Sequence, residues 1–181
     1  MRVFSTGLQM GDNMDFVEEY IIGRRSVRSY ADAPIEKEKI EKLIKACFYA
    51  PTSMNRDPRS LMIVDDKTVL SQIAEIHPYA KFAANAPLAM VVCAEPDKTV
   101  RDFFIEDCAA STQNILVAAK AMGMGSCWCA IYHTSRVKQF ATLLGTPENV
   151  IPFALIVLGY PAEEGKKPNR DLETTVHYNK W

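Results

Sequence analysis

The stretch GRRSVRSYADAPI, residues 23–35, is the most informative part of the chain, because it joins a basic cluster to the start of a helix. Arg24, Arg25 and Arg28 lie within five positions of a chain whose formal net charge is -1. If this stretch were helical, the three would share one face, where like charges four residues apart cost roughly 0.2–0.5 kcal/mol. Two interpretations stay open: a solvated basic face, or an anion site in which Ser26 adds a hydroxyl donor to the guanidinium groups.

The length and composition indicate a soluble globular protein. The chain has 181 residues, 48% of them hydrophobic and 24% charged, which predicts one domain with its own core. The near-neutral net charge argues against general binding of nucleic acids or membrane surfaces. No apolar run reaches the roughly 18 residues that span a bilayer. Residues 1–13 lack the apolar core of a signal peptide, so we expect a flexible extension, a domain over residues 14–181 and a cytoplasmic location.

The cysteines indicate reduced thiols and no metal site. Their number is odd and no signal peptide precedes them, which favours a reducing compartment. The CWC motif at residues 127–129 lacks the spacing of a zinc site, and the histidines supply no second ligand pair. We therefore expect buried free cysteines. The five are Cys47, Cys93, Cys108, Cys127 and Cys129.

Hydrophobic periodicity and turn residues predict alternating helices and buried strands. The pattern predicts helices opening at Asp15, over residues 35–50 and 68–76, and over residues 101–122, where the helix is apolar on most sides after Cys108. Residues 61–64 form an expected short buried strand, and residues 87–95 and 153–160 are expected central strands. Residues 123–125 are expected as a turn that ends the long helix, and residues 161–181 as an irregular polar tail. This order predicts an α+β or α/β fold.

Four short polar stretches remain as candidate site segments, and each alone is a weak signal. They are RRSVR (24–28), PTSMN (51–55), GMGSCW (123–128) and KKPNR (166–170). No histidine is placed near a serine or cysteine in a hydrolase motif. The two glycines of GMG follow a helix instead of a strand, so they are not a dinucleotide fingerprint.

Taken in order, these stretches resemble the FMN-dependent nitroreductase family over nearly the whole chain, from about Met14 to Trp181. The family's Arg-Arg-Ser-x-Arg motif, followed by an aromatic residue and a proline, is similar to residues 24–34. Its Ala-Pro-Ser/Thr-x-x-Asn motif is similar to residues 50–55, and its Gln-Asn pair to residues 113–114. Its Gly-x-Gly-Ser-x-Trp segment resembles residues 123–128. Its Gly-Tyr-Pro strand end, basic cluster and terminal tryptophan resemble residues 159–161, Lys167 with Arg170, and Trp181.

The resemblance implies an α+β fold: a central mixed, mostly antiparallel sheet flanked by helices, in a homodimer with FMN at the subunit interface. The chain departs from the family at residues 56–59, where RDPR replaces the usual x-Gln-Pro-Trp. An acid and a base, Asp57 and Arg59, are therefore expected beside the flavin edge. This departure affects the predicted substrate class and pocket shape more than flavin binding.

The resemblance also assigns site residues. It implies that Arg24, Arg25 and Ser26 hold the phosphate and ribityl end of FMN, and that Arg28 reaches the pyrimidine side of the ring. Lys167 and Arg170 would return from the tail to the phosphate. The next two sets follow from the same resemblance. The partner subunit would line the cofactor with Pro51, Thr52, Ser53 and Asn55, and the flavin's central ring would lie against Cys129, Ala130 and Ile131.

For Cys129, Ala130 and Ile131 the family places a backbone N–H at flavin N5, and a buried strand edge is an equally open interpretation. No side chain need act as acid or base. The implied activity is that of an NAD(P)H-dependent oxidoreductase that passes electrons through the flavin to nitroaromatics, quinones or similar small acceptors. The alternatives are a flavin-binding redox sensor or storage protein, or a specialised branch of the same superfamily. An anion- or nucleic-acid-binding module would need a wider basic surface.

Overall fold

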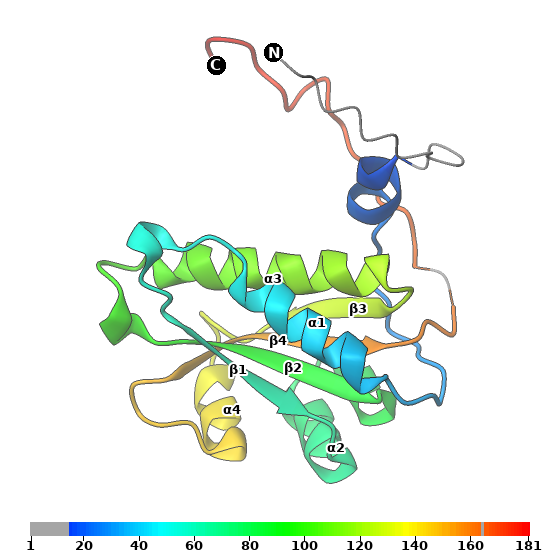
Figure 1. The fold of residues 1–181 in the computed structure, drawn as a ribbon, viewed down its shortest axis with the longest axis vertical. Helices are drawn as coiled ribbons and strands as arrows, with labels where there is room; N and C mark the ends of the chain where they lie inside the picture. The colour runs from blue at the N-terminus through cyan, green and yellow to red at the C-terminus, as the bar shows by residue number, and fades with distance from the viewer. Residues whose placement is uncertain (1–14, 164) are drawn as a thin grey trace, which may run out of the picture.

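The computed structural model describes residues 15–163 and 165–181 (Figure 1). The extension predicted over residues 1–13 lies outside the described residues, so the domain boundary at residue 14 stays a prediction. The helices are η1 (Val17–Ile22), a π-helix, and α1 (Lys37–Phe48), α2 (Lys67–Ile76), α3 (Phe104–Ala121) and α4 (Arg136–Leu144). Short 3₁₀ turns are η2 (Ser53–Asn55), η3 (Lys81–Asn85) and η4 (Pro96–Lys98). The strands are β1 (Arg59–Val64), β2 (Leu88–Ala94), β3 (Gly125–Ala130) and β4 (Ile151–Gly159).

The four strands form one sheet in the order β1-β2-β4-β3, and every neighbouring pair is antiparallel. The predicted α+β class is confirmed. The parallel component is one isolated bridge that joins Ser26, outside the strands, to Ser126 of β3. The two strands predicted to be central, β2 and β4, are buried almost throughout. The prediction of a buried strand at residues 61–64 is wrong in part: β1 is an edge strand, and Ile63 is exposed.

Helices cover both faces of the sheet, with α1 and α3 on one side and α2 and α4 on the other (Figure 1). Alternate residues of the central strands serve the two layers, because side chains alternate along a strand. Met90 and Ile156 pack on the α3 side with Ile115. Val91 and Val157 belong to the other layer, where side chains from α2 and α4 complete the core. The long apolar helix predicted over residues 101–122 is α3, and the sheet buries one side of it.

Two elements were missed from the sequence. The segment GSCWCA forms β3, although glycine and serine are weak strand formers. Helix α4 buries only Phe140 and was not predicted, yet it ends at Gly145 with φ 65°, the left-handed conformation that favours glycine after a helix. The turn expected at residues 123–125 is confirmed at Gly123, with φ 76°, and β3 begins immediately afterwards.

Residues 23–31 are not helical but run in an extended path against β3 and the end of β4, and we call this segment the strap. The backbone N–H of Val27 donates to the carbonyl of Ser126 at 3.0 Å, and that of Ala31 to Tyr160 at 2.9 Å. A Cβ on Gly125 would lie 2.7 Å from the Cβ of Val27, so only glycine permits this approach. The three arginines therefore project from an extended segment and not from one helix face.

The described parts of the tail, residues 161–163 and 165–181, are irregular, as predicted, and the tail runs past η1 away from the sheet (Figure 1). Its large apolar side chains have little cover within this chain: Leu172, Val176 and Tyr178 are exposed, and Trp181 is fully exposed. Among the described helices, none is both long enough and apolar enough to cross a membrane.

Candidate functional site

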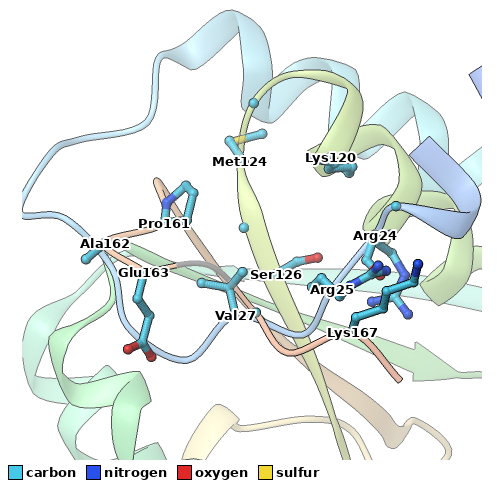
Figure 2. Close-up of a pocket in the computed structure, with 14 residues that line it drawn as sticks. Arg24, Arg25, Val27, Lys120, Met124, Ser126, Pro161, Ala162, Glu163 and Lys167 are labelled. Carbon is cyan, nitrogen blue, oxygen red and sulfur yellow. The ribbon is translucent and has the colours of Figure 1, made fainter. Parts of the chain in front are cut away.

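A basic cavity of about 650 Å³ lies where the strap, the end of α3, the start of β3 and the tail meet. Figure 2 shows Arg24 and Arg25 reaching into this region from the strap and Lys167 from the tail, with Lys120 near the end of α3. An adjoining cavity of about 510 Å³ shares Arg24 and Arg25. Its further lining includes Ser26, Arg28, Lys166 and Arg170. The structure thus brings together six of the predicted site residues, from both ends of the chain.

Close backbone packing holds the tail over the strap. The backbone N–H of Ala162 donates to the carbonyl of Ser29 at 3.0 Å. A Cβ on Gly165 would stand 2.4 Å from the Cβ of Arg25 and 3.0 Å from the carbonyl oxygen of Ser26. Only glycine therefore fits at position 165, where the tail crosses the strap. This crossing brings Lys167 and Arg170 to the same cavities as Arg24.

Among the residues that the structure describes, no carboxylate forms an ion pair with the basic side chains of these cavities. Among the described residues, the ion pairs are those of Lys39 with Glu36, Arg59 with Asp57, and Lys98 with Glu95. Nη1 of Arg25 donates to backbone carbonyls close to it in sequence, those of Ile22 in η1 at 2.6 Å and of Arg24 at 2.8 Å. Glu163 lines both cavities, but in Figure 2 its carboxylate points away from Arg24 and Arg25. Such a gathering of unpaired cations suits a multiply charged anion.

The thiols of β3 respond to this charge. Cys127 and Cys129 lie two residues apart on one face of the strand, and both are buried. A hydrogen bond from the Cys129 thiol, together with the charge of Arg28, outweighs the effect of burial and lowers the pKa of Cys127 to about 7. The same hydrogen bond, together with burial, raises the pKa of Cys129. All five cysteines are buried and free, as predicted, and the described residues include no cluster of three or more metal-ligating side chains.

Beyond the strap, no described strand pairs with the outer edge of β3. Ala130, the last residue of this strand, is exposed. In an antiparallel pair, each residue directs its N–H and C=O to the same side. The carbonyl of Ser126 accepts from the strap, so the alternate residues Trp128 and Ala130 also direct their backbone groups away from β4. The N–H of Ile131 instead donates to the carbonyl of Phe153 at 3.3 Å. Of the predicted Cys129, Ala130 and Ile131, only Ala130 therefore offers an outward N–H.

The structure does not bring Pro51, Thr52, Ser53 and Asn55 to these cavities. The backbone N–H of Ser53 donates to Oδ1 of Asp107 at 2.8 Å, which places this segment at the N-terminal end of α3 (Figure 1). The cavity lies at the other end, beside Lys120. From Asp107 to Lys120 the helix rises about 20 Å at ~1.5 Å per residue. Within one chain, the two predicted halves of the site are therefore separate.

Arg59 does not lie at the edge of a pocket, which corrects the expectation from the RDPR departure. Its side chain is only 4% exposed, and its guanidinium donates to the carbonyls of Cys47, Phe48 and Ala50 at 3.2–3.3 Å. It also donates to Oγ of Ser111 and, through Nε, to Asp57 at 2.8 Å. Arginine thus satisfies the last carbonyls of α1, a structural role that the motif comparison could not reveal.

The loop between α1 and β1 has an unusual backbone. Met54, Asn55 and Asp57 have positive φ angles of 56°, 54° and 50°. Non-glycine residues in this region carry strain, and such residues cluster at functional sites. Hydrogen bonds to two buried residues hold the loop in this shape: Ser53 donates to Asp107, and Arg59 donates to Asp57. Asn55 is left exposed on the surface.

Comparison with known proteins agrees with this geometry. The Nitroreductase family model matches residues 21–160, which span the strap, the sheet and all the long helices. The chain belongs to the Nitroreductase family. A protein of Archaeoglobus fulgidus is 38% identical over 167 residues, covering 89% of this chain and 96% of that protein. That relative is named an NADH dehydrogenase/NAD(P)H nitroreductase, and its name marks this activity as inferred.

Solved structures share the fold. An FMN-dependent nitroreductase from Clostridium difficile R20291 superimposes with a TM-score of 0.83 at 31% identity, covering 91% of this chain and 99% of that chain. The NADPH:FMN oxidoreductase of Vibrio harveyi, solved with NAD⁺, gives a TM-score of 0.83 at 25% identity, covering 92% of this chain and 78% of that chain.

Several residues of the site were missed from the sequence. Lys120 and Glu163 line the larger cavity, and Lys166 lines the smaller one. The KK pair at residues 166–167 was a signal for Lys166, whereas Lys120 comes from a helix whose direction only the fold reveals. His77 and Arg136 both contact the carbonyl of Ala130, from elements far from it in sequence.

Proposed function

We propose that this chain is an FMN-dependent oxidoreductase that takes a hydride from NAD(P)H and reduces nitroaromatics, quinones or similar electron-poor acceptors. One observation carries the proposal: basic side chains from the strap and the tail line adjoining cavities beside the outer edge of β3. Membership of the Nitroreductase family supports it. Relatives named for this chemistry include FMN reductase (NADPH) of Bacillus subtilis, which is 27% identical over 183 residues.

The residues present fit FMN. Arg24, Arg25 and Arg170 would hold its phosphate, together with Lys167 and the hydroxyl of Ser26, through charge-assisted hydrogen bonds. The cavities, of about 650 and 510 Å³, are within the roughly 300–1,000 Å³ typical of ligand pockets. No wide basic surface is needed, because the charge is concentrated where the phosphate would lie.

FMN, when bound, supplies the two-electron chemistry, accepting hydride from NAD(P)H and passing electrons to the acceptor. The chain supplies position and charge. Arg28 would place a positive charge beside the pyrimidine side of the ring, which raises the reduction potential. The outward N–H of Ala130 would donate to N5, beside the small side chains of Cys129 and Ile131. No side chain of the site is assigned as a general acid or base.

The proposal includes a homodimer with two equivalent sites. Pro51, Thr52, Ser53 and Asn55 lie about 20 Å from the cavity along α3, so they would complete the site of the other subunit. A two-fold axis would repeat this exchange at both sites. The exposed apolar residues of the tail, with Trp181 the most exposed, would be covered by the second chain.

Purified protein mixed with FMN tests the proposal directly. We expect flavin absorbance to stay with the protein after gel filtration, and NAD(P)H to be oxidised in the presence of a nitroaromatic or quinone. Protein that retains FMN without oxidising either nicotinamide nucleotide would favour a sensor or storage role. Protein that binds no flavin even after reconstitution would overturn the assignment of the basic cavity.

A further inference from the structure

A buried histidine contacts β3 at Ala130, which lines neither basic cavity and whose N–H is the donor proposed for the flavin. His77 follows α2 and is 1% exposed, with its ring edge-on to Tyr79 and Phe140. Its Nδ1 accepts from the backbone N–H of Tyr79 at 3.3 Å. Since an N–H group can only donate, Nδ1 carries no proton, and the proton of the neutral ring lies on Nε2. That N–H then donates to the carbonyl of Ala130, 3.1 Å away.

A second donor reaches the same oxygen from the neighbouring helix α4. Nη2 of Arg136, in the first turn of α4, lies 3.2 Å from the carbonyl of Ala130. A carbonyl oxygen has two lone pairs, so these two donors occupy both. Two side chains, one of them buried, thus donate to a single backbone oxygen at the end of β3. One follows α2 and the other lies in α4.

The consequence concerns what the strand edge presents to a ligand. The N–H and C=O of Ala130 point to the same, open side of β3. An acceptor left free there would compete with the N–H and repel an electron-rich ring nitrogen. Because His77 and Arg136 engage the carbonyl, Ala130 presents only its N–H donor at this edge, and the orientation of its peptide groups is held.

We propose that His77 and Arg136 are positioning residues that hold Ala130 so that its N–H faces N5 of the flavin. This inference rests on the proposed function. It also predicts a pH response, because protonation of Nδ1 would set two donors, the ring and the Tyr79 N–H, against each other. Burial lowers the pKa of His77, and the positive charge of Arg136 adds to this effect. Arg136 and Tyr79 are the charged and titratable side chains placed against the ring.

Three variants separate positioning from general stability. His77→Leu removes the donor, whereas His77→Gln places an amide donor near the position of Nε2. Arg136→Met removes the second donor at a half-buried position, so it keeps the test usable if His77→Leu does not fold. Lys138→Met, on the exposed face of the same helix, is the matched control.

The measurements are the Ala130 amide resonance on titration with FMN, the midpoint potential of the flavin and its rate of reduction by NAD(P)H over pH 5–8. We expect FMN to shift the Ala130 amide strongly in the wild type, and weakly in His77→Leu and Arg136→Met. The reduction rate should fall about tenfold in both, equivalent to ~1.4 kcal/mol, with FMN affinity nearly unchanged. The wild-type reduction rate should decline at low pH, where His77 becomes protonated. His77→Gln should retain most of the rate and show no such decline.

The outcomes distinguish this inference from the function beneath it. Wild-type protein that binds no FMN would overturn the proposed function itself. Wild-type protein that binds and reduces FMN, with His77→Leu and Arg136→Met matching Lys138→Met in amide shift, potential and rate, would overturn only the positioning roles.

Discussion

Gly165 lies so close to Arg25 that a Cβ on the glycine would stand 2.4 Å from the Cβ of the arginine. This contact joins two segments about 140 residues apart in sequence, the strap and the tail, and it determines where the tail's basic residues lie. The carbonyl of Ser26, 3.0 Å from the same Cβ position, leaves little room for adjustment. The anion site therefore depends on a position without any functional group.

Replacing Gly165 should weaken FMN binding without damaging the core. Gly165→Val would push the tail away from the strap and so remove Lys167 and Arg170 from the phosphate, a loss of about tenfold or more in affinity. Asn169→Ala, in the same tail but outside both cavity linings, is the control. Titration of apoprotein with FMN measures the effect, and equal affinity in the two variants would contradict the proposed crossing.

Arg24→Ala and Arg28→Ala should differ in kind. Loss of Arg24 should mainly weaken retention of FMN, by ~1.5–3 kcal/mol for a hydrogen bond to a charged group. Loss of Arg28 should also lower the flavin's reduction potential, because its charge lies along the edge of β3 near both cysteines. Lys45→Ala, at the exposed end of α1, provides the baseline. Identical binding and midpoint potentials for the two arginine variants would refute their separate roles.

Subunit association and FMN binding should be linked. Because each proposed site uses both chains, ligand bound across the interface stabilises the dimer by mass action. We expect sedimentation at low micromolar concentration to show a dimer with FMN, and Asn55→Ala to weaken both FMN binding and association. Ser60→Ala, a small change in edge strand β1, serves as the control. A stable monomer that keeps its flavin would exclude the cross-subunit role of Asn55.

The stability of the fold should fall with acidification because of His77. Burial lowers its pKa below the ordinary value of 6.5. The unfolded chain then binds a proton that the folded chain excludes, so stability is fully present above pH 6.5 and declines as the pH falls toward the folded pKa. The slope is at most ~1.4 kcal/mol per pH unit for one proton. Urea unfolding of wild type and His77→Gln at several pH values measures this, and parallel pH profiles would count against it.

Arg59→Leu should be strongly destabilising even though the residue lies outside the cavity. It would leave the carbonyls of Phe48 and Ala50 without the guanidinium donor in a largely buried setting, at a cost on the order of 3 kcal/mol. Arg56→Leu, at an exposed position of the same loop, should change stability little. Urea denaturation decides between them, and a loss below ~1 kcal/mol in Arg59→Leu would show that water replaces the guanidinium.

The helices and strands that have local sequence signals could be predicted from the sequence. Periodicity predicted α1, α2 and α3, and continuous apolar runs predicted β2 and β4, because these patterns follow from which faces are buried. Helix α4 was missed because only Phe140 is buried and no start signal was recognised. Strand β3 was missed because GSCWCA has weak strand propensity and pairs only with residues distant in sequence.

The candidate site divides along the same line. The family resemblance grouped Arg24, Arg25, Ser26, Arg28, Lys167 and Arg170 as one expected set, and their chemistry agrees, since arginines, a hydroxyl and lysine are groups that bind phosphate. Tertiary structure decided the rest: the inward turn of Arg59, the separation of Asn55 from the cavity, and the two donors on the carbonyl of Ala130. Those contacts depend on the direction of side chains and on the approach of elements far apart in sequence, and no local pattern encodes either.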